Sequence, residues 1–166
     1  MFIITQIIMP FTNANIKNRL IRFILLSGIL LAGSVQQVFA ADPVNTTFFG
    51  NTAIKGYDPV AYFVENAPVK GDKQYTFEWQ GANWQFASQA NLDTFKSDPV
   101  AYAPQYGGYC AWAVANNKLA PIDPSQFAIY EGKLYLNYNA SIAEKWLADK
   151  DDFITQADAN WPDVLN

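Results

Sequence analysis

The sequence predicts an α+β domain in which a small antiparallel sheet, built from two β-hairpins, is covered by short α-helices. Aromatic and polar residues alternate on both sides of Gly81, and two mostly apolar segments flank Glu131-Gly132-Lys133 as a second hairpin. This period-two alternation is typical of hairpins with one buried face. Short segments between and after the hairpins begin with helix-capping residues. Hairpins combined with short helices in a chain of this size indicate the α+β class.

The pentapeptide Asp-Pro-Val-Ala-Tyr occurs twice, at residues 58–62 and 98–102. Asp at an N-cap followed by Pro at the first helical position marks a helix start. We therefore expect a short helix from Pro59 to about Val64 and a second helical turn after Asp98. Because only five residues are shared, the repetition indicates reuse of a capping sequence rather than an internal duplication.

The two hairpins are expected after an extended lead-in over residues 41–50. The first pairs residues 75–80 with 83–87, and the second pairs 127–130 with 134–138. Helices are expected wherever a capping residue precedes an apolar pattern. They run from Ser88 to Ser97, from Tyr109 to about Ala115 after a loop at 104–108, from a capping box formed by Ser141 and Glu144, and from Phe153 to about Ala159.

The first 40 residues have the pattern of a cleavable signal peptide. Three basic residues precede an apolar run at 23–33, namely Lys17, Arg19 and Arg22. The run leads into Val38-Phe39-Ala40, whose residues suit a signal peptidase site. A membrane anchor is the alternative, but a spanning helix needs about 20 apolar residues and this run is shorter. Cleavage after Ala40 is therefore expected.

Cleavage would leave residues 41–166 as a single domain, in the periplasm or secreted, with no stable membrane span. Translation from Met1 or from Met9 gives the same mature chain. This part of the chain has eight lysines, no arginine and 15 acidic residues, a net charge of −7. It does not suit nucleic-acid binding, because neutralising phosphates requires clustered cations.

The absence of histidine from the whole chain restricts the possible chemistry. A Ser-His-Asp triad, a Cys-His pair and a His-based zinc site cannot form within one chain. No complete catalytic constellation can be assembled from the remaining residues. The sequence therefore favours a protein that is not an enzyme, with no catalytic residue assigned.

Nearly all of residues 41–166 is similar to a known family. The similarity is carried by the following segments: Gly56-Tyr57-Asp58-Pro59-Val60-Ala61-Tyr62, Trp84-Gln85-Phe86-Ala87-Ser88 with Phe95, Asp98-Pro99-Val100-Ala101-Tyr102, Gly107-Gly108-Tyr109-Cys110-Ala111 and Gly132-Lys133-Leu134-Tyr135-Leu136-Asn137-Tyr138. On these residues the chain resembles the exported bacterial branch of the YHS-domain proteins. The resemblance bears on fold and compartment more than on activity.

The resemblance also raises the question of a metal. Metal-associated members of the wider family carry a cysteine after Asp-Pro-Val and two more in a Phe-Cys-Ser-x-x-Cys segment. The matching positions here are Ala61, Ala87 and Asn91. The metal role that the wider family implies therefore cannot be transferred to this chain on those residues, and zinc binding is expected to be weak.

Cys110 is the only cysteine and has the most distinctive chemistry in the chain. Its place at a helix start after two glycines would favour the thiolate, whereas Ala111 and Ala113 indicate a packed, inert thiol. Both alternatives stay open. A reactive Cys110 could act through a mixed disulfide or sulfenic acid, contribute to a copper ion site shared by two chains, or link a homodimer.

Aromatic side chains near the Gly-Gly sequence are the second candidate feature. Tyr57, Tyr106, Tyr109 and Trp112 could line a small-ligand pocket, although most aromatics of such a domain belong to its core. Asp58 and Asp98 are expected first as N-caps. The acidic residues at 149, 151 and 152 lack an EF-hand pattern and indicate a solvated helix start.

These observations lead to one hypothesis and one alternative. The first is a periplasmic, non-enzymatic accessory or ligand-binding module of YHS type, whose ligand is a metal ion, a small molecule or a protein. The candidate binding residues are Tyr57, Asp58, Gly108, Tyr109, Cys110 and Trp112, with Cys110 also the candidate metal ligand. The alternative is a single-cysteine thiol-redox protein acting through Cys110.

Overall fold

The structure, a computed structural model, describes residues 40–166, which belong to one unit of the chain, Val38–Asn166. The expected signal peptide lies outside the described residues, apart from Ala40. Both hydrophobic cores are made entirely of residues between Val44 and Val164. This unit therefore has a core of its own.

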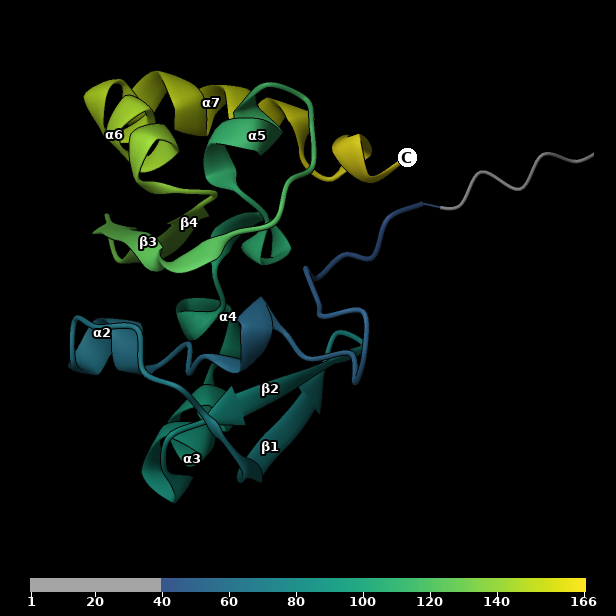
Figure 1. The fold of residues 1–166 in the computed structure, drawn as a ribbon, viewed down its shortest axis with the longest axis vertical. Helices are drawn as coiled ribbons and strands as arrows, with labels where there is room; N and C mark the ends of the chain where they lie inside the picture. Colours follow the sequence, from purple (N-terminus) through teal and green to yellow (C-terminus); the bar gives the residue numbers. More distant parts are fainter. Residues whose placement is uncertain (1–39) are drawn as a thin grey trace, which may run out of the picture. The chain divides into compact units, whose positions relative to one another are not determined.

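The first hairpin pairs β1 (Asp72–Trp79) antiparallel with β2 (Ala82–Phe86). Gln80 and Gly81 close it with φ angles of 49° and 73°, the conformation that a tight hairpin turn of this hand requires. Helix α3 (Gln89–Ser97) follows and packs against both strands (Figure 1). The first hairpin and the helix after it are confirmed.

The second hairpin pairs β3 (Asp123–Tyr130) with β4 (Lys133–Asn137). Three helices pack on it or on one another: α5 (Ala111–Ala115), α6 (Ala140–Ala148) and α7 (Lys150–Asn160). Figure 1 shows these helices gathered on one side of the hairpin. The short elements are α2 (Ala61–Val64), α4 (Pro99–Tyr102) and three 3-10 turns, η1 (Ile54–Gly56), η2 (Gln105–Gly108) and η3 (Asp163–Leu165).

The α+β class is confirmed, but the hairpins form two separate two-stranded sheets rather than one. On β2 and on β4, another segment bridges to the edge that a joined sheet could use. Thr52 forms a parallel bridge to Asn83 of β2, and Cys110 forms one to Leu136 of β4. A strand has two edges, so a strand already paired on both has no edge left for the other hairpin.

The second hairpin lies between two cores. Leu134 and Leu136 of β4 join the larger core together with Trp84, Phe86 and other residues of the first half. Tyr135, which points to the opposite face of the strand, packs against Trp146 with ring centroids 5.0 Å apart. This strand is therefore buried on both faces.

Four predicted helix starts are wrong in detail. Helix α5 begins at Ala111 rather than Tyr109, and α7 begins at Lys150 rather than Phe153. Helix α2 begins at Ala61, because Pro59 and Val60 form a turn ahead of it. Helix α6 is capped by Asn139, whose Oδ1 accepts from Ile142 N at 3.0 Å. Ser141 donates to that same oxygen instead of forming a capping box. Asn is as good an N-cap as Ser, so which of Asn139 and Ser141 caps α6 depends on where β4 ends.

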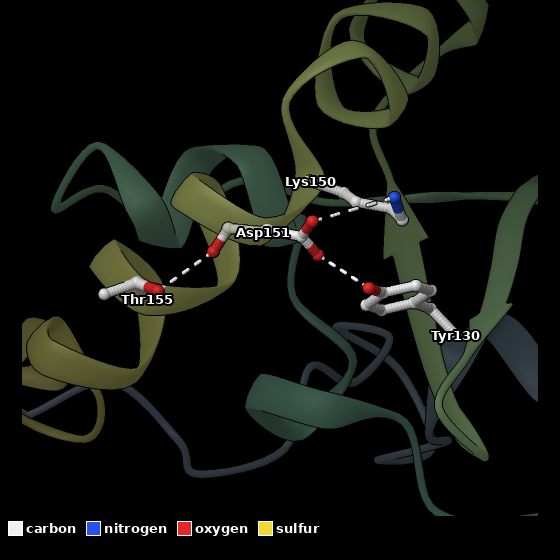
Figure 2. A network of polar contacts seen from close by, with 4 residues as sticks. All are labelled: Tyr130, Lys150, Asp151 and Thr155. Atoms are coloured by element: carbon white, nitrogen blue, oxygen red, sulfur yellow. Dashed lines mark hydrogen bonds and ion pairs between the residues drawn. The ribbon is translucent and has the colours of Figure 1, made fainter.

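Polar contacts join the second hairpin to the start of α7 (Figure 2). Tyr130 OH donates to Asp151 Oδ1 at 2.7 Å, and Lys150 Nζ lies 4.0 Å from the other oxygen of this carboxylate. The ammonium also lies 4.5 Å from the centre of the Tyr130 ring. Thr155 Oγ1 donates to the carbonyl oxygen of Asp151 at 2.9 Å. Asp151 thus takes part in contacts of a helix start, where a negative charge is favourable.

Candidate functional site

The Gly107-Gly108 loop lies against the lead-in segment, residues 42–45. Gly107 O accepts from Asn45 N at 2.8 Å, and Gly108 O accepts from Asn45 Nδ2 at 2.9 Å. A Cβ atom on Gly107 would lie 1.9 Å from Pro43 O, and one on Gly108 would lie 2.7 Å from Ile54 Cγ2. Both φ angles are positive, at 59° and 78°. Two glycines are therefore needed here for backbone shape and for close approach.

Two tyrosines beside the loop are held by hydrogen bonds. Tyr109 OH donates to Asp42 O at 2.9 Å, which fixes the lead-in a second time. Tyr106 OH donates to Asp158 Oδ1 of α7 at 2.8 Å. Burial, followed by this hydrogen bond, raises the pKa of Tyr106, so its hydroxyl stays a donor.

An open cavity of about 570 Å³ lies beside this loop, bordered by four parts of the chain: the lead-in, the tip of the first hairpin, residues 100–107 and the C-terminal residues from 161. Aromatic side chains form much of its wall: Trp79, Trp84, Tyr106 and Trp161. Gln80 and Gln105 are the polar side chains besides the Tyr106 hydroxyl, and no lining residue is charged. Its size and apolar character are those of a small-molecule site. We refer to it as the aromatic cavity.

Asp58 is fully buried, at 0% exposure, and its carboxylate accepts four hydrogen bonds. Oδ1 accepts from the backbone N–H groups of Val60 at 2.8 Å and Ala61 at 3.2 Å. Oδ2 accepts from Ala87 N at 2.8 Å and Asn91 Nδ2 at 2.7 Å. A buried carboxylate requires such partners, because an unpaired charge away from water is very costly. Asp58 therefore joins the start of α2 to the β2–α3 connection.

Three of the four donors around Asp58 lie at positions that bear on the family resemblance. The resemblance places Ala61, Ala87 and Asn91 where metal-associated YHS proteins carry cysteines, and each of the three donates a hydrogen bond to this carboxylate. Residues 60–106 match the YHS domain family.

The YHS segment contains α2, the first hairpin, α3 and α4, and it ends at Tyr106 in the wall of the aromatic cavity. The resemblance to the YHS domain is confirmed over these residues, whereas the exported bacterial branch stays a prediction. The second hairpin, Cys110 and helices α5 to α7 lie outside the match. Comparisons with curated proteins and with solved structures gave no match. Each helix in residues 40–166 is too short or too polar to cross a membrane.

A family-type metal does not fit the YHS segment of this chain. The three matching positions supply two backbone N–H groups and an amide Nδ2, all of which donate to Asp58, so no thiolate is offered there. Within residues 40–166, no three His, Cys, Asp or Glu side chains gather where they could hold a metal ion.

Cys110 is the N-cap residue of α5, the helix start expected for it, but the thiol is buried at 1% exposure. Its Sγ lies 3.7 Å from Oδ1 of Asn137, a buried amide that also accepts from Trp112 N. Burial raises the pKa of the Cys110 thiol, and the nearby backbone N–H groups offset this only in part. A reactive thiol requires a lowered pKa and access. Neither the redox alternative, a shared copper site nor a disulfide-linked dimer gains support.

The other candidate residues do not form a single site. The Lys70 ammonium lies 4.6 Å from the centre of the Tyr57 ring. Asp58 is fully buried among its hydrogen-bond donors. Gly108 and Tyr109 hold the lead-in, and Trp112 is half-buried on α5. The cavity wall supplied by the first hairpin and by Trp161 was not predicted from the sequence. Alternation assigned the hairpin aromatics to the core, and nothing in the sequence indicated that the C-terminal segment returns to them.

We expect native Cys110 to react slowly with a thiol reagent such as dithiobis-nitrobenzoate, and quickly only after unfolding. The raised pKa leaves little thiolate near pH 8, and burial excludes the reagent. Cys110→Ser should lower the free energy of unfolding by about 1–3 kcal/mol, because it buries a smaller and more polar group in a position shaped for the thiol. Rapid stoichiometric labelling of the folded protein at pH 7 would contradict this account.

Proposed function

We propose that this chain is a non-enzymatic ligand-binding module of YHS type, and that its ligand is an uncharged small molecule bound in the aromatic cavity. The observation that supports this is the cavity itself: about 570 Å³, aromatic walls and no charged lining residue. A charged ligand would lose its hydration there without finding a partner of opposite charge. A neutral, planar molecule would find aromatic faces and apolar surface.

Two amide side chains supply the polar contacts for such a ligand. Gln80 at the tip of the first hairpin and Gln105 in η2 both line the cavity. Among residues 40–166, neither side chain has another residue as a hydrogen-bond partner, so both are available to a ligand. An amide offers a donor and an acceptor, so the ligand is expected to carry a carbonyl, hydroxyl or amide group at its edge.

Export remains part of the proposal. The pattern of residues 1–40 is that of a signal peptide, and the pairing of Ala41 N with Leu165 O, at 2.6 Å, would tie down the new N-terminus that cleavage creates. Intact-mass analysis of protein recovered from the periplasmic fraction should give a chain that begins at Ala41. A chain that retains residues 23–33 would show that this segment is an anchor.

A pair of exposed valines provides the test of the ligand site. Val100 of α4 lines the cavity and is 74% exposed, whereas Val64 of α2 does not line it and is 62% exposed. Val100→Asp places a carboxylate at the cavity edge and should weaken binding of the neutral fluorescent probe N-phenylnaphthylamine about tenfold, or about 1.4 kcal/mol. Both valines are solvent-exposed, so neither variant should unfold the protein.

The matched variant Val64→Asp should bind the probe as the unmodified protein does, measured by the rise in probe emission. The anionic analogue anilinonaphthalene sulfonate should bind the unmodified protein more weakly than the neutral probe. If both valine variants bind the neutral probe equally, or if the anionic probe binds better, the aromatic cavity is not the site of an uncharged ligand.

A further inference from the structure

A depression of about 630 Å³ on the domain concentrates positive charge. Lys55, Lys70 and Lys73 line it, and the other lining residues are all uncharged. These are three of the eight lysines in a part of the chain that carries a net charge of −7. Among residues 40–166 none of the three forms an ion pair; the one ion pair there joins Lys150 and Asp151. The depression is therefore a local basic region on an acidic domain.

Two phenylalanines project beside this depression. Phe48 is 94% exposed and Phe49, which lines the depression, is 85% exposed. Their rings contact each other edge to face, with centroids 4.9 Å apart. Adjacent large aromatic residues with this much exposure form an apolar patch, which in a soluble domain marks an interaction site.

Hydrogen bonds hold the turn that carries these phenylalanines. Thr47 N donates to Thr52 O at 2.9 Å, and Thr47 Oγ1 donates to Phe49 O at 2.8 Å. Asn83 Nδ2 of the first hairpin donates to Gly50 O at 3.2 Å. The turn is thus fixed to the hairpin, and the exposure of the two rings follows from its geometry rather than from a lack of contacts.

We propose that the Phe48–Phe49 turn and the lysine depression together form a docking surface for an anionic phospholipid membrane. Aromatic rings insert at the boundary between headgroups and acyl chains, and lysine ammonium groups pair with lipid phosphates just outside it. The exposed phenylalanines would occupy the boundary between headgroups and acyl chains, and the lysine depression would face the lipid phosphates. A surface without the lysines would not discriminate by lipid charge, and one without the rings would bind through charge alone.

This surface is distinct from the aromatic cavity, because the two share no lining residue. Membrane docking and small-molecule binding can therefore be tested separately. Among the lysines, Lys70 is the most constrained: its ammonium donates to Lys55 O and lies over the Tyr57 ring. Lys55 and Lys73 are exposed and are the better choices for substitution.

The experiment is sedimentation of residues 41–166, which contain both cores, with vesicles of phosphatidylcholine alone or mixed with phosphatidylglycerol. We expect binding to the anionic vesicles that weakens as salt is added, and much weaker binding to the neutral ones. Phe48→Ser/Phe49→Ser should lower the partition coefficient at least about tenfold. Lys55→Gln/Lys73→Gln should lower it about fivefold per lysine on anionic vesicles only.

Val64→Ser/Leu147→Ser is the matched control, since these side chains are also exposed, at 62% and 54%, but do not line the depression. It should bind vesicles as the unmodified domain does, and circular dichroism should show all variants folded. The proposal would be overturned if the phenylalanine variant bound vesicles as well as the unmodified domain, or if binding did not depend on lipid charge. So would sedimentation equilibrium showing that the two rings instead hold a dimer that does not bind vesicles.

Discussion

Asp58→Ala is expected to lower the free energy of unfolding by about 3–5 kcal/mol, a large part of the total stability of a domain this size. The substitution leaves the N–H groups of Val60, Ala61 and Ala87 and the side-chain amide of Asn91 without their acceptor. Asp58 is fully buried, so water cannot replace the carboxylate unless the structure opens. Urea denaturation measures the change.

The repeated pentapeptide gives this experiment its control. Asp98 precedes the same Pro-Val-Ala-Tyr sequence, but it is exposed and its carboxylate accepts one hydrogen bond, from Ala101 N at 3.2 Å. Asp98→Ala should therefore cost about 1 kcal/mol, the usual value of an N-cap. Equal losses at the two positions would show that Asp58 is only a cap and that its contacts to Ala87 and Asn91 contribute little.

A double-mutant cycle isolates the contact between Asp58 and Asn91. Asp58→Asn can place an amide N–H group opposite the donors Ala87 N and Asn91 Nδ2. Asn91→Asp places two carboxylates within hydrogen-bonding distance of each other. Each single substitution should therefore lower the free energy of unfolding. The double variant restores one donor and one acceptor. We expect it to be about 1–3 kcal/mol more stable than the sum of the single losses, with rescue incomplete because Ala87 N stays unpaired. Additive losses would argue against a direct contact.

Gly107→Ala is the second substitution with a large expected effect. The new Cβ would lie 1.9 Å from Pro43 O, so either the loop or the lead-in must move. This movement would break the hydrogen bond from Asn45 N to Gly107 O and open the aromatic cavity, which both segments line. We expect a loss of about 3 kcal/mol or more in the free energy of unfolding and loss of probe binding.

Gly81→Ala separates the clash from backbone strain. Gly81 also has a positive φ, at 73°, but nothing lies within 4 Å of the position that its Cβ would take. This variant should lose only about 1 kcal/mol, the cost of placing alanine in this conformation, and should keep probe binding. If Gly107→Ala and Gly81→Ala lower the free energy of unfolding equally, then Gly107 is not in close contact with the lead-in. The cavity wall would then not be fixed by this contact.

Local signals in the sequence were sufficient for most of the secondary structure. Both hairpins turn at a residue followed by glycine, at Gln80-Gly81 and Glu131-Gly132, and Ser88 caps α3 as expected. These features depend on residues close together in the chain. The two-sided burial of β4 and the separation of the sheets were not predicted, because they depend on which distant segment pairs with a strand edge, such as Cys110 with Leu136.

The candidate site was predicted less well for the same reason. The Gly-Gly loop was found, because paired glycines signal unusual backbone, but its partner, the lead-in at Pro43 to Asn45, lies more than 60 positions away. Asp58 has the sequence of an N-cap, and nothing local shows that Ala87 and Asn91 also reach its carboxylate. Cys110 was left open between two alternatives that only burial can separate.

The most direct test of the ligand site is a nuclear magnetic resonance titration that follows the indole N–H signals of the five tryptophans in residues 41–166. Trp79, Trp84 and Trp161 line the aromatic cavity, whereas Trp112 and Trp146 do not. Addition of N-phenylnaphthylamine should shift the first three signals in a saturable manner and leave the other two in place. Shifts confined to Trp112 and Trp146, or no saturable shift at all, would contradict the proposal that this chain binds a neutral ligand in that cavity.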